Sequence, residues 1–166
     1  MIVAAQVNIN GSSKAAIWAA ITNIANASEI ISGIETIEVL EKPANELVGL
    51  RWRETRMLFG KPATVEKWIT DAAENEFYTT RAEDGGFVFV STMRIAESGG
   101  GMTLTSSHET RPQGIVAKLQ ATSMFSIPLM VSEAFSMLVI AAQIAALDPL
   151  MVTCASTIMV FLLGFE

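Results

Sequence analysis

The sequence has one cysteine, one histidine and no excess of positive charge, and each shortage excludes a class of protein. Cys154 cannot form an internal disulfide, and together with His108 it cannot build an ordinary zinc site of cysteine and histidine ligands. Eleven Lys and Arg residues stand against seventeen Asp and Glu residues, which gives a net charge of −6. Phosphate backbones require a basic surface, which such a chain lacks. We therefore expect no metal, no cofactor and no nucleic-acid partner.

The first ten residues lack the features of a signal peptide. Residues 1–10 contain no Lys or Arg, and their apolar stretch is too short for the hydrophobic region of a signal peptide. The single cysteine also fits a reducing compartment. We therefore expect a cytoplasmic protein, and 166 residues are enough for one domain with an adequate core.

Charge is almost missing from the C-terminal third of the chain. All eleven basic residues lie at or before Lys118, and only three acidic residues follow it. Two apolar runs, residues 129–147 and 150–165, fill this tail and are separated by Asp148-Pro149, a pair that favours a turn. Each run is slightly shorter than the roughly 20 residues that span a bilayer.

Periodicity predicts one strand and then one helix at the start of the chain. Residues 2–9 alternate between apolar and polar, which is typical of a half-buried strand. Ser12 or Ser13 can cap the following helix, in which Ile17, Ile21 and Ile24 recur on one face. A short second helical segment is expected to end at Gly33.

After Gly33 the apolar residues alternate with a period of two, which predicts strands joined by short turns. The six predicted strands are residues 34–41, 47–58, 63–70, 77–82, 87–95 and 102–110. With residues 2–9 they make seven antiparallel strands with one early helical region, which is an α+β arrangement. Such a meander must curl around something, and we expect the C-terminal segment to fill it and to leave a cavity.

Candidate binding residues lie on the third predicted strand. Trp52, Glu54 and Arg56 share one face, because side chains alternate across a strand. If this face points inward, Glu54 and Arg56 keep each other charged and can orient a hydroxyl, carboxyl or carbonyl group of a ligand. The alternative is a solvated pair at the rim of the sheet, where it would contribute little.

The last two predicted strands supply further candidates for the cavity lining. We assign to the concave side the alternate residues Phe87, Phe89, Ser91, Met93 and Ile95, and on the next strand Leu104, Ser106 and His108. The predicted ligand-binding set is Trp52, Glu54, Arg56, Phe87, Phe89, Ser91, Met93, Leu104, Ser106 and His108. A single β-bulge would move any of these residues to the other face.

The sequence contains no complete catalytic constellation. His108 or Glu54 would be the acid or base if the protein were an enzyme, and the alternative for His108 is a hydrogen-bonded residue of the cavity wall. No Ser-His-Asp or Cys-His set can be assembled, since Cys154 lies in the apolar tail.

Several short motifs are shared with a known group of proteins: residues 49–56 (GLRWRETR), Gly60, Val65, Glu66 and Trp68, the early Ile17-Trp18 pair, and residues 29–34. On these motifs the sequence, over residues 1–118, resembles the SRPBCC superfamily, which includes START domains and Bet v 1-like proteins. Among its members it is most similar to the polyketide cyclase/dehydrase-like family. It implies a helix-grip fold, in which a seven-stranded antiparallel sheet curves around a long C-terminal helix with an apolar cavity between them. It also implies an apolar ligand and, in a minority of members, cyclisation or dehydration chemistry.

The tail departs from that family pattern. A helix over residues 129–147 would be apolar on nearly every side and would need cover on every side. Three interpretations stay open: a divergent grip helix followed by a covering or oligomerising segment, a tail in an aberrant reading frame, and a membrane hairpin. We expect a helix-grip domain over residues 1–147 and an apolar extension over residues 148–166.

These observations favour a cytoplasmic carrier or sensor that encloses a lipid or polyketide-like molecule without catalysis. The first alternative is a polyketide cyclase or dehydratase that uses the same cavity. The second is an interaction module that contacts a membrane or another copy of the chain through residues 129–165.

Overall fold

The computed structural model describes residues 2–31, 33–58, 60–113 and 159–163. Strand β1 (Ile2–Ile9) is followed by helix α1 (Lys14–Thr22), a 3-10 turn η1 (Ile24–Asn26) and the short helix α2 (Ala27–Ile30). The Ser13 hydroxyl accepts a hydrogen bond from the Ala16 amide at 3.2 Å and caps α1, as predicted. Ile17 and Ile21 are buried, so the apolar face of α1 packs toward the sheet.

Six further strands follow in the predicted order. They are β2 (Ile34–Glu41), β3 (Arg51–Leu58), β4 (Lys61–Ala73), β5 (Phe77–Asp84), β6 (Phe87–Ser98) and β7 (Gly101–Pro112). Consecutive strands pair antiparallel, which confirms the meander, and β7 pairs with β1. β3 begins four residues later than predicted, because residues 47–50 form a turn in which Gly49 has a φ of +89°.

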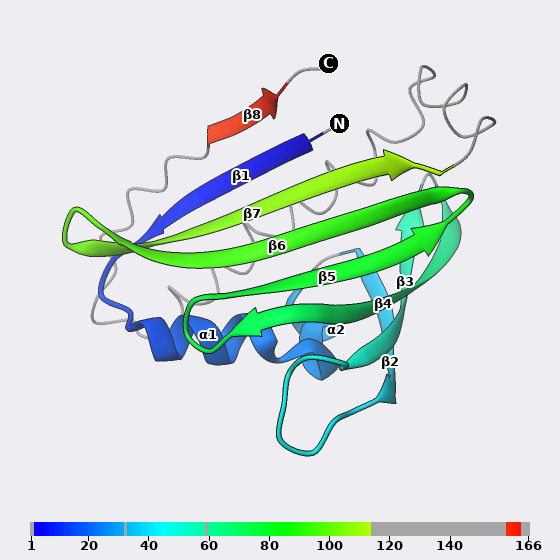
Figure 1. The fold of residues 1–166 in the computed structure, drawn as a ribbon, viewed down its shortest axis with the longest axis horizontal. Coiled ribbons are helices and arrows are strands. Elements are labelled where there is room, and N and C mark those ends of the chain that lie inside the picture. Colours follow the sequence, from blue (N-terminus) through cyan, green and yellow to red (C-terminus); the bar gives the residue numbers. More distant parts are fainter. Residues whose placement is uncertain (1, 32, 59, 114–158, 164–166) are drawn as a thin grey trace.

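An eighth strand, β8 (Met159–Leu163), pairs antiparallel with β1. The sheet order is therefore β2-β3-β4-β5-β6-β7-β1-β8. No strand was predicted in this segment, and the seven predicted strands are all present beside it. β8 covers the edge of β1 that faces away from β7 (Figure 1).

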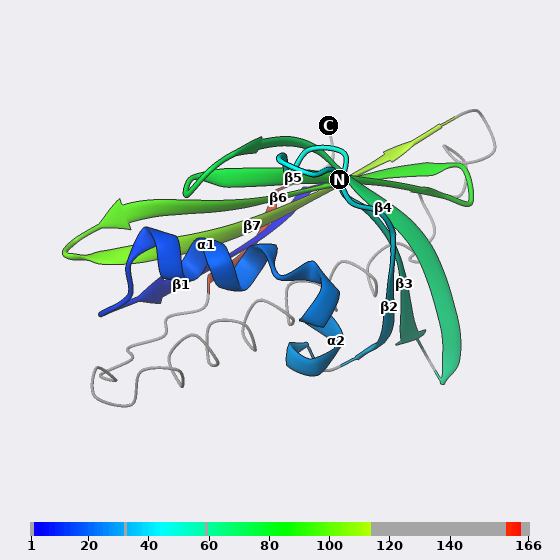
Figure 2. The same cartoon turned by 90° about the horizontal axis from the view of Figure 1, so that it is seen from below.

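The sheet is strongly curved, and the helices lie on its concave side. Figure 2 shows β2, β3 and β4 bending away from the flatter part formed by β5, β6 and β7, with α1 and α2 in the resulting hollow. Register shifts in β2–β3 and in β4–β5 accompany this bend, as β-bulges do. The core lies between the helices and the sheet, where Tyr78 of β5 donates a hydrogen bond from its hydroxyl to the carbonyl of Ile21 at 3.1 Å.

The remaining predictions for the tail fall on residues that the structure does not describe. The long C-terminal helix, the apolar run of residues 129–147 and most of residues 148–166 lie outside the described ranges. The membrane and oligomer interpretations of residues 129–165 depend on these residues. Within the described ranges, each helix is too short or too polar to cross a bilayer.

Candidate functional site

The site begins with the inward face of β3. Trp52, Glu54 and Arg56 are 3%, 4% and 5% exposed, whereas Arg53 and Thr55 between them are partly exposed. The alternation of side chains along a strand, here called parity, predicted that these two sets lie on opposite faces. No bulge between β3 and β4 disturbs this arrangement. The burial of Glu54 and Arg56 favours the inward interpretation over a solvated pair at the rim.

A third charged residue, Lys67 of β4, joins this buried pair. Glu54 Oε1 accepts hydrogen bonds from Arg56 Nε and from Lys67 Nζ, the latter at 3.2 Å. The Trp52 indole donates to Glu54 Oε2 at 3.4 Å. Only 5%, 7% and 13% of the Glu54, Arg56 and Lys67 side chains are exposed. Buried charges are tolerated when they are paired and hydrogen-bonded, and these contacts meet that requirement.

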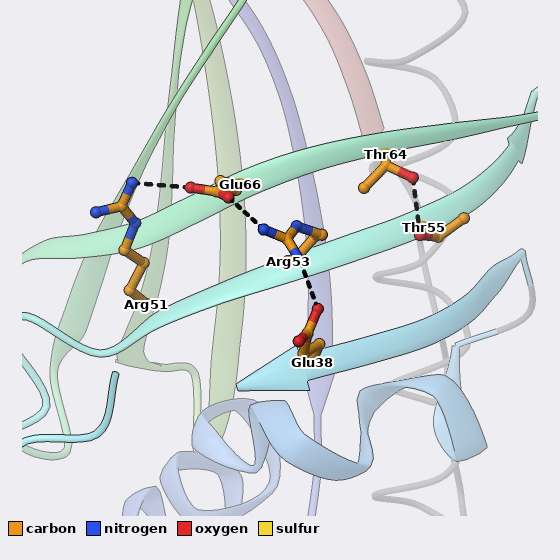
Figure 3. Close-up of polar contacts among 6 residues, drawn as sticks. All are labelled: Glu38, Arg51, Arg53, Thr55, Thr64 and Glu66. Carbon is orange, nitrogen blue, oxygen red and sulfur yellow. Dashed lines mark hydrogen bonds and ion pairs between the residues drawn. The ribbon is translucent and has the colours of Figure 1, made fainter. Parts of the chain in front are cut away.

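The outward face of β3 carries a separate set of ion pairs. Arg53 bridges Glu38 of β2 at 2.7 Å and Glu66 of β4 at 2.8 Å, and Arg51 also binds Glu66 at 2.8 Å (Figure 3). Hydrogen bonds from Arg53 and then Arg51 lower the pKa of Glu66 below its ordinary value. Farther along the pair of strands, the Thr55 and Thr64 hydroxyls are hydrogen-bonded at 2.9 Å. This network ties three strands together on the face opposite the site.

His108 of β7 is buried between two serine side chains. Its Nδ1 atom lies 2.8 Å from Ser91 Oγ, and its Nε2 atom lies 2.7 Å from Ser106 Oγ. A hydroxyl can donate or accept a hydrogen bond, so the two serines can accommodate either neutral tautomer of the ring and the protonated form. The predicted alternative of a hydrogen-bonded wall residue therefore agrees with these contacts, and they hold the ring in a fixed orientation.

These polar side chains form a row across the concave face, here called the polar row. Thr80, Ser91 and His108 are direct cross-strand partners on β5, β6 and β7. Lys67 lies opposite Ala82, two residues from Thr80 and on the same face. The polar row consists of Glu54, Arg56, Lys67, Thr80, Ser91 and His108.

Two cavities lie on either side of the polar row, with volumes of about 90 Å³ and about 100 Å³. The first, the hairpin-side cavity, lies toward the β5–β6 turn and is also lined by Ala63, Thr64, Val65, Ala82, Asp84, Phe89, Glu109 and Thr110. The second, the helix-side cavity, is also lined by Ala20, Ile21, Asn23, Ile24, Ala27, Ile31, Ile34, Trp52, Tyr78, Met93 and Ser106. Each has room for more than one water-sized group, since one such group needs about 10–15 Å³.

Eight of the ten predicted binding residues line at least one cavity. The other two, Phe87 and Leu104, line neither. Leu104 is fully buried in the core, and Phe87 lies beyond Phe89, with 6.4 Å between the two ring centroids. Ile95, assigned to the same concave side, is also a buried core residue. Parity therefore identified the face, but not the depth of each residue within it.

Several lining residues were not among the predicted set. Lys67 could have been found from parity, because it lies between Val65 and Ile69 on an apolar face of the predicted strand. Thr80 and Tyr78 give no such signal, since alternating threonines and tyrosines are common in strands. Across the described ranges, no cluster of three or more His, Cys, Asp or Glu residues could hold a metal ion.

Comparisons with known proteins identify the fold. No protein-family model and no curated protein matches the sequence. A solved structure from Thermus thermophilus is similar with a TM-score of 0.71 at 13% identity, covering 89% of this chain and 99% of that one. The Zhui aromatase/cyclase of Streptomyces is similar with a TM-score of 0.69 at 14% identity, covering 89% of this chain and 96% of that one.

A START superfamily protein of Mycobacterium smegmatis is similar with a TM-score of 0.59 at 14% identity, covering 83% of this chain and 96% of that chain. Together these likenesses show that the chain has the α+β helix-grip fold of START and aromatase/cyclase structures, as the sequence resemblance implied. Identities this low establish the fold and leave the activity to be argued from the site.

Proposed function

We propose that this protein binds an apolar small molecule, of lipid or polyketide-like character, on the concave face of its sheet, as a carrier or sensor. The observation that carries the proposal is the pair of cavities that meet at the polar row, in which four of the six residues are buried. A pocket lined mainly by apolar side chains, with a few fixed polar groups, is the usual form of a small-molecule site.

The physical basis is enclosure. Contact with Ile21, Ile24, Trp52 and Met93 would remove ligand carbon from water, which stabilises the complex by about 25 cal/mol per Å² of apolar surface. An oxygen of the ligand would lose its water at the same time and would need a hydrogen-bond donor. Arg56 and Lys67 are donors that face both cavities, and a guanidinium carries five N–H groups, so it can bind a ligand while it holds Glu54.

An apolar fluorescent probe tests this proposal. The folded protein should bind the probe in a saturable manner and with a fixed stoichiometry, and fatty acids or aromatic polyketides should displace it. The absence of saturable binding by folded protein would contradict the proposal.

Two neighbouring residues of β6 give a matched control. Met93 lines the helix-side cavity, whereas Arg94 is exposed on the other face, where it lies over the Phe77 ring at 4.6 Å. Met93→Trp should fill the cavity and weaken probe binding about tenfold, while Arg94→Trp should leave it unchanged. Equal effects of the two substitutions would place the probe elsewhere.

A second candidate function is cyclisation or dehydration of a polyketide-like substrate in the same cavities. The position of His108 favours it, because the ring faces both cavities and is held by Ser91 and Ser106. A neutral imidazole could take a proton from the carbon next to a ligand carbonyl. An enzyme should lose turnover in His108→Asn while still binding the probe, and a carrier should show no turnover in either form.

A further inference from the structure

The polar row divides the concave face into two arms of different chemistry. All six of its residues line both cavities, so the two cavities meet along the row. Beyond the row, the helix-side arm is mainly apolar and ends among Ile24, Ile31 and Ile34. The hairpin-side arm is mixed, with Ala63, Val65, Ala82 and Phe89 beside the carboxylates of Asp84 and Glu109.

The charged groups of the two arms limit where a polar group of the ligand can lie. Beyond the row, the described lining of the helix-side arm offers Tyr78, Asn23 and Ser106 but no charged side chain. Asp84 is exposed at the outer end of the hairpin-side arm, and Glu109 is ion-paired with Arg111 at 2.6 Å. An anionic head group would meet like charge there. The row itself is the part of the site rich in donors.

We infer that the two cavities are the arms of one elongated site, whose ligand carries its oxygen near the middle of its carbon skeleton. This inference rests on the proposed function and names the class of ligand. A molecule with a terminal polar group can place it at the row and fill one arm only. A molecule with a central oxygen can place that oxygen at the row and fill both arms, so it removes more carbon from water.

Positional isomers of an alcohol test this directly. 1-Dodecanol and 6-dodecanol have the same formula and no charge, and they differ only in the position of the hydroxyl. We expect 6-dodecanol to displace the fluorescent probe at a concentration about tenfold lower than 1-dodecanol does. Both hydroxyls are hydrogen-bonded at the row, but only 6-dodecanol also fills the second arm. Equal potency, or tighter binding of 1-dodecanol, would overturn the inference and leave the proposed function intact.

Variants of the row test whether the hydroxyl lies there. Thr80→Val with Ser91→Ala should weaken the binding of both dodecanols by a similar factor, because each isomer places its hydroxyl at the row. The control is Thr79→Val with Thr92→Ala, which removes the neighbouring hydroxyl pair, hydrogen-bonded at 3.0 Å on the opposite face of β5 and β6. Unchanged binding of both alcohols in the row variant would contradict the placement of the hydroxyl beside Thr80 and Ser91.

A variant that blocks one arm tests the two-arm site separately from the proposed function. Ala82→Phe should block the hairpin-side arm, so it should weaken 6-dodecanol more than 1-dodecanol, which can use the helix-side arm alone. Equal weakening of both alcohols would overturn the two-arm site. If the folded wild-type protein binds neither the probe nor either alcohol, the proposed function itself is wrong.

Discussion

The two faces of β3 carry the same residue types in opposite surroundings. On the inner face, one carboxylate, Glu54, is shared by Arg56 and Lys67, and these side chains are at most 13% exposed. On the outer face, Arg53 is shared by Glu38 and Glu66, and these side chains are between 36% and 62% exposed. The two groups differ in their exposure to solvent rather than in their number of ion pairs.

This difference determines what each group can do. Water competes for the outer ions and salt screens them, so they contribute little to stability and chiefly join neighbouring strands. The inner ions have lost most of their water, so each depends on its partners, and breaking the group is expected to be costly. Buried charge of this kind is weak evidence for stability, and it is consistent with the binding role that we propose.

The largest effect should come from removing one charge on each face in turn. Glu54→Gln leaves Arg56 and Lys67 buried without their shared carboxylate and should lower the free energy of unfolding by about 3 kcal/mol. Glu66→Gln should cause a much smaller loss, because Arg51 and Arg53 can turn to water. Urea denaturation of the two variants measures both, and equal losses would remove the distinction between the faces.

Ligand affinity should show an intermediate effect. Arg56→Ala should weaken binding of a fatty acid about tenfold, because it removes a donor that faces both cavities and can bind the ligand's oxygen. Arg53→Ala, three residues away and on the other face, should stay within about twofold of wild type. Comparable losses in the two variants would mean that the ligand does not contact the inner face.

The smallest effect concerns the pH dependence of the outer face. The folded pKa of Glu66 is lowered by Arg53 and Arg51, so its contribution to stability is present above the unfolded pKa of about 4.3 and is lost as the pH falls through the lower folded value. The stability difference between wild type and Glu66→Gln should therefore be constant between about pH 5 and 7 and should disappear in acid. The same stability difference should also be smaller in 1 M salt, which screens exposed ion pairs. A stability difference that grows as the pH falls would contradict the assignment to Glu66.

How far sequence reasoning reached can be judged on particular residues. Alternation alone placed Trp52, Glu54 and Arg56 on one face, because a strand allows no other arrangement unless a bulge intervenes. Alternation left open whether that face was buried or a solvated rim, and the structure shows it to be buried. The partnership of Lys67 with Glu54 was missed because it depends on the register between β3 and β4. That register follows from the geometry of the turn at Gly60 as well as from local preference.

Strand β8 and the depth of two predicted cavity residues were not foreseen, for other reasons. Residues 159–163 (MVFLL) are apolar throughout, and such a run has no period that separates a strand from a buried helix. Phe87 and Leu104 have the right parity but the wrong depth, since one lies beyond the cavity and the other below it. Depth depends on the curvature of the whole sheet, and the positions of the bulges that bend it are not visible in a hydrophobic pattern.

The pairing of β1 has a consequence for the order of events during synthesis. β1 is synthesised before the other strands of this sheet, yet its partners β7 and β8 lie about a hundred and about a hundred and fifty residues later. At roughly 5–20 residues per second, β1 must wait several seconds for β7 and longer for β8. Its alternating apolar face is exposed during that time, and such long-range pairing is slow in itself. Chaperone demand during translation should therefore be concentrated on the first strand of this fold rather than on the later meander, whose strands each find a partner within one turn.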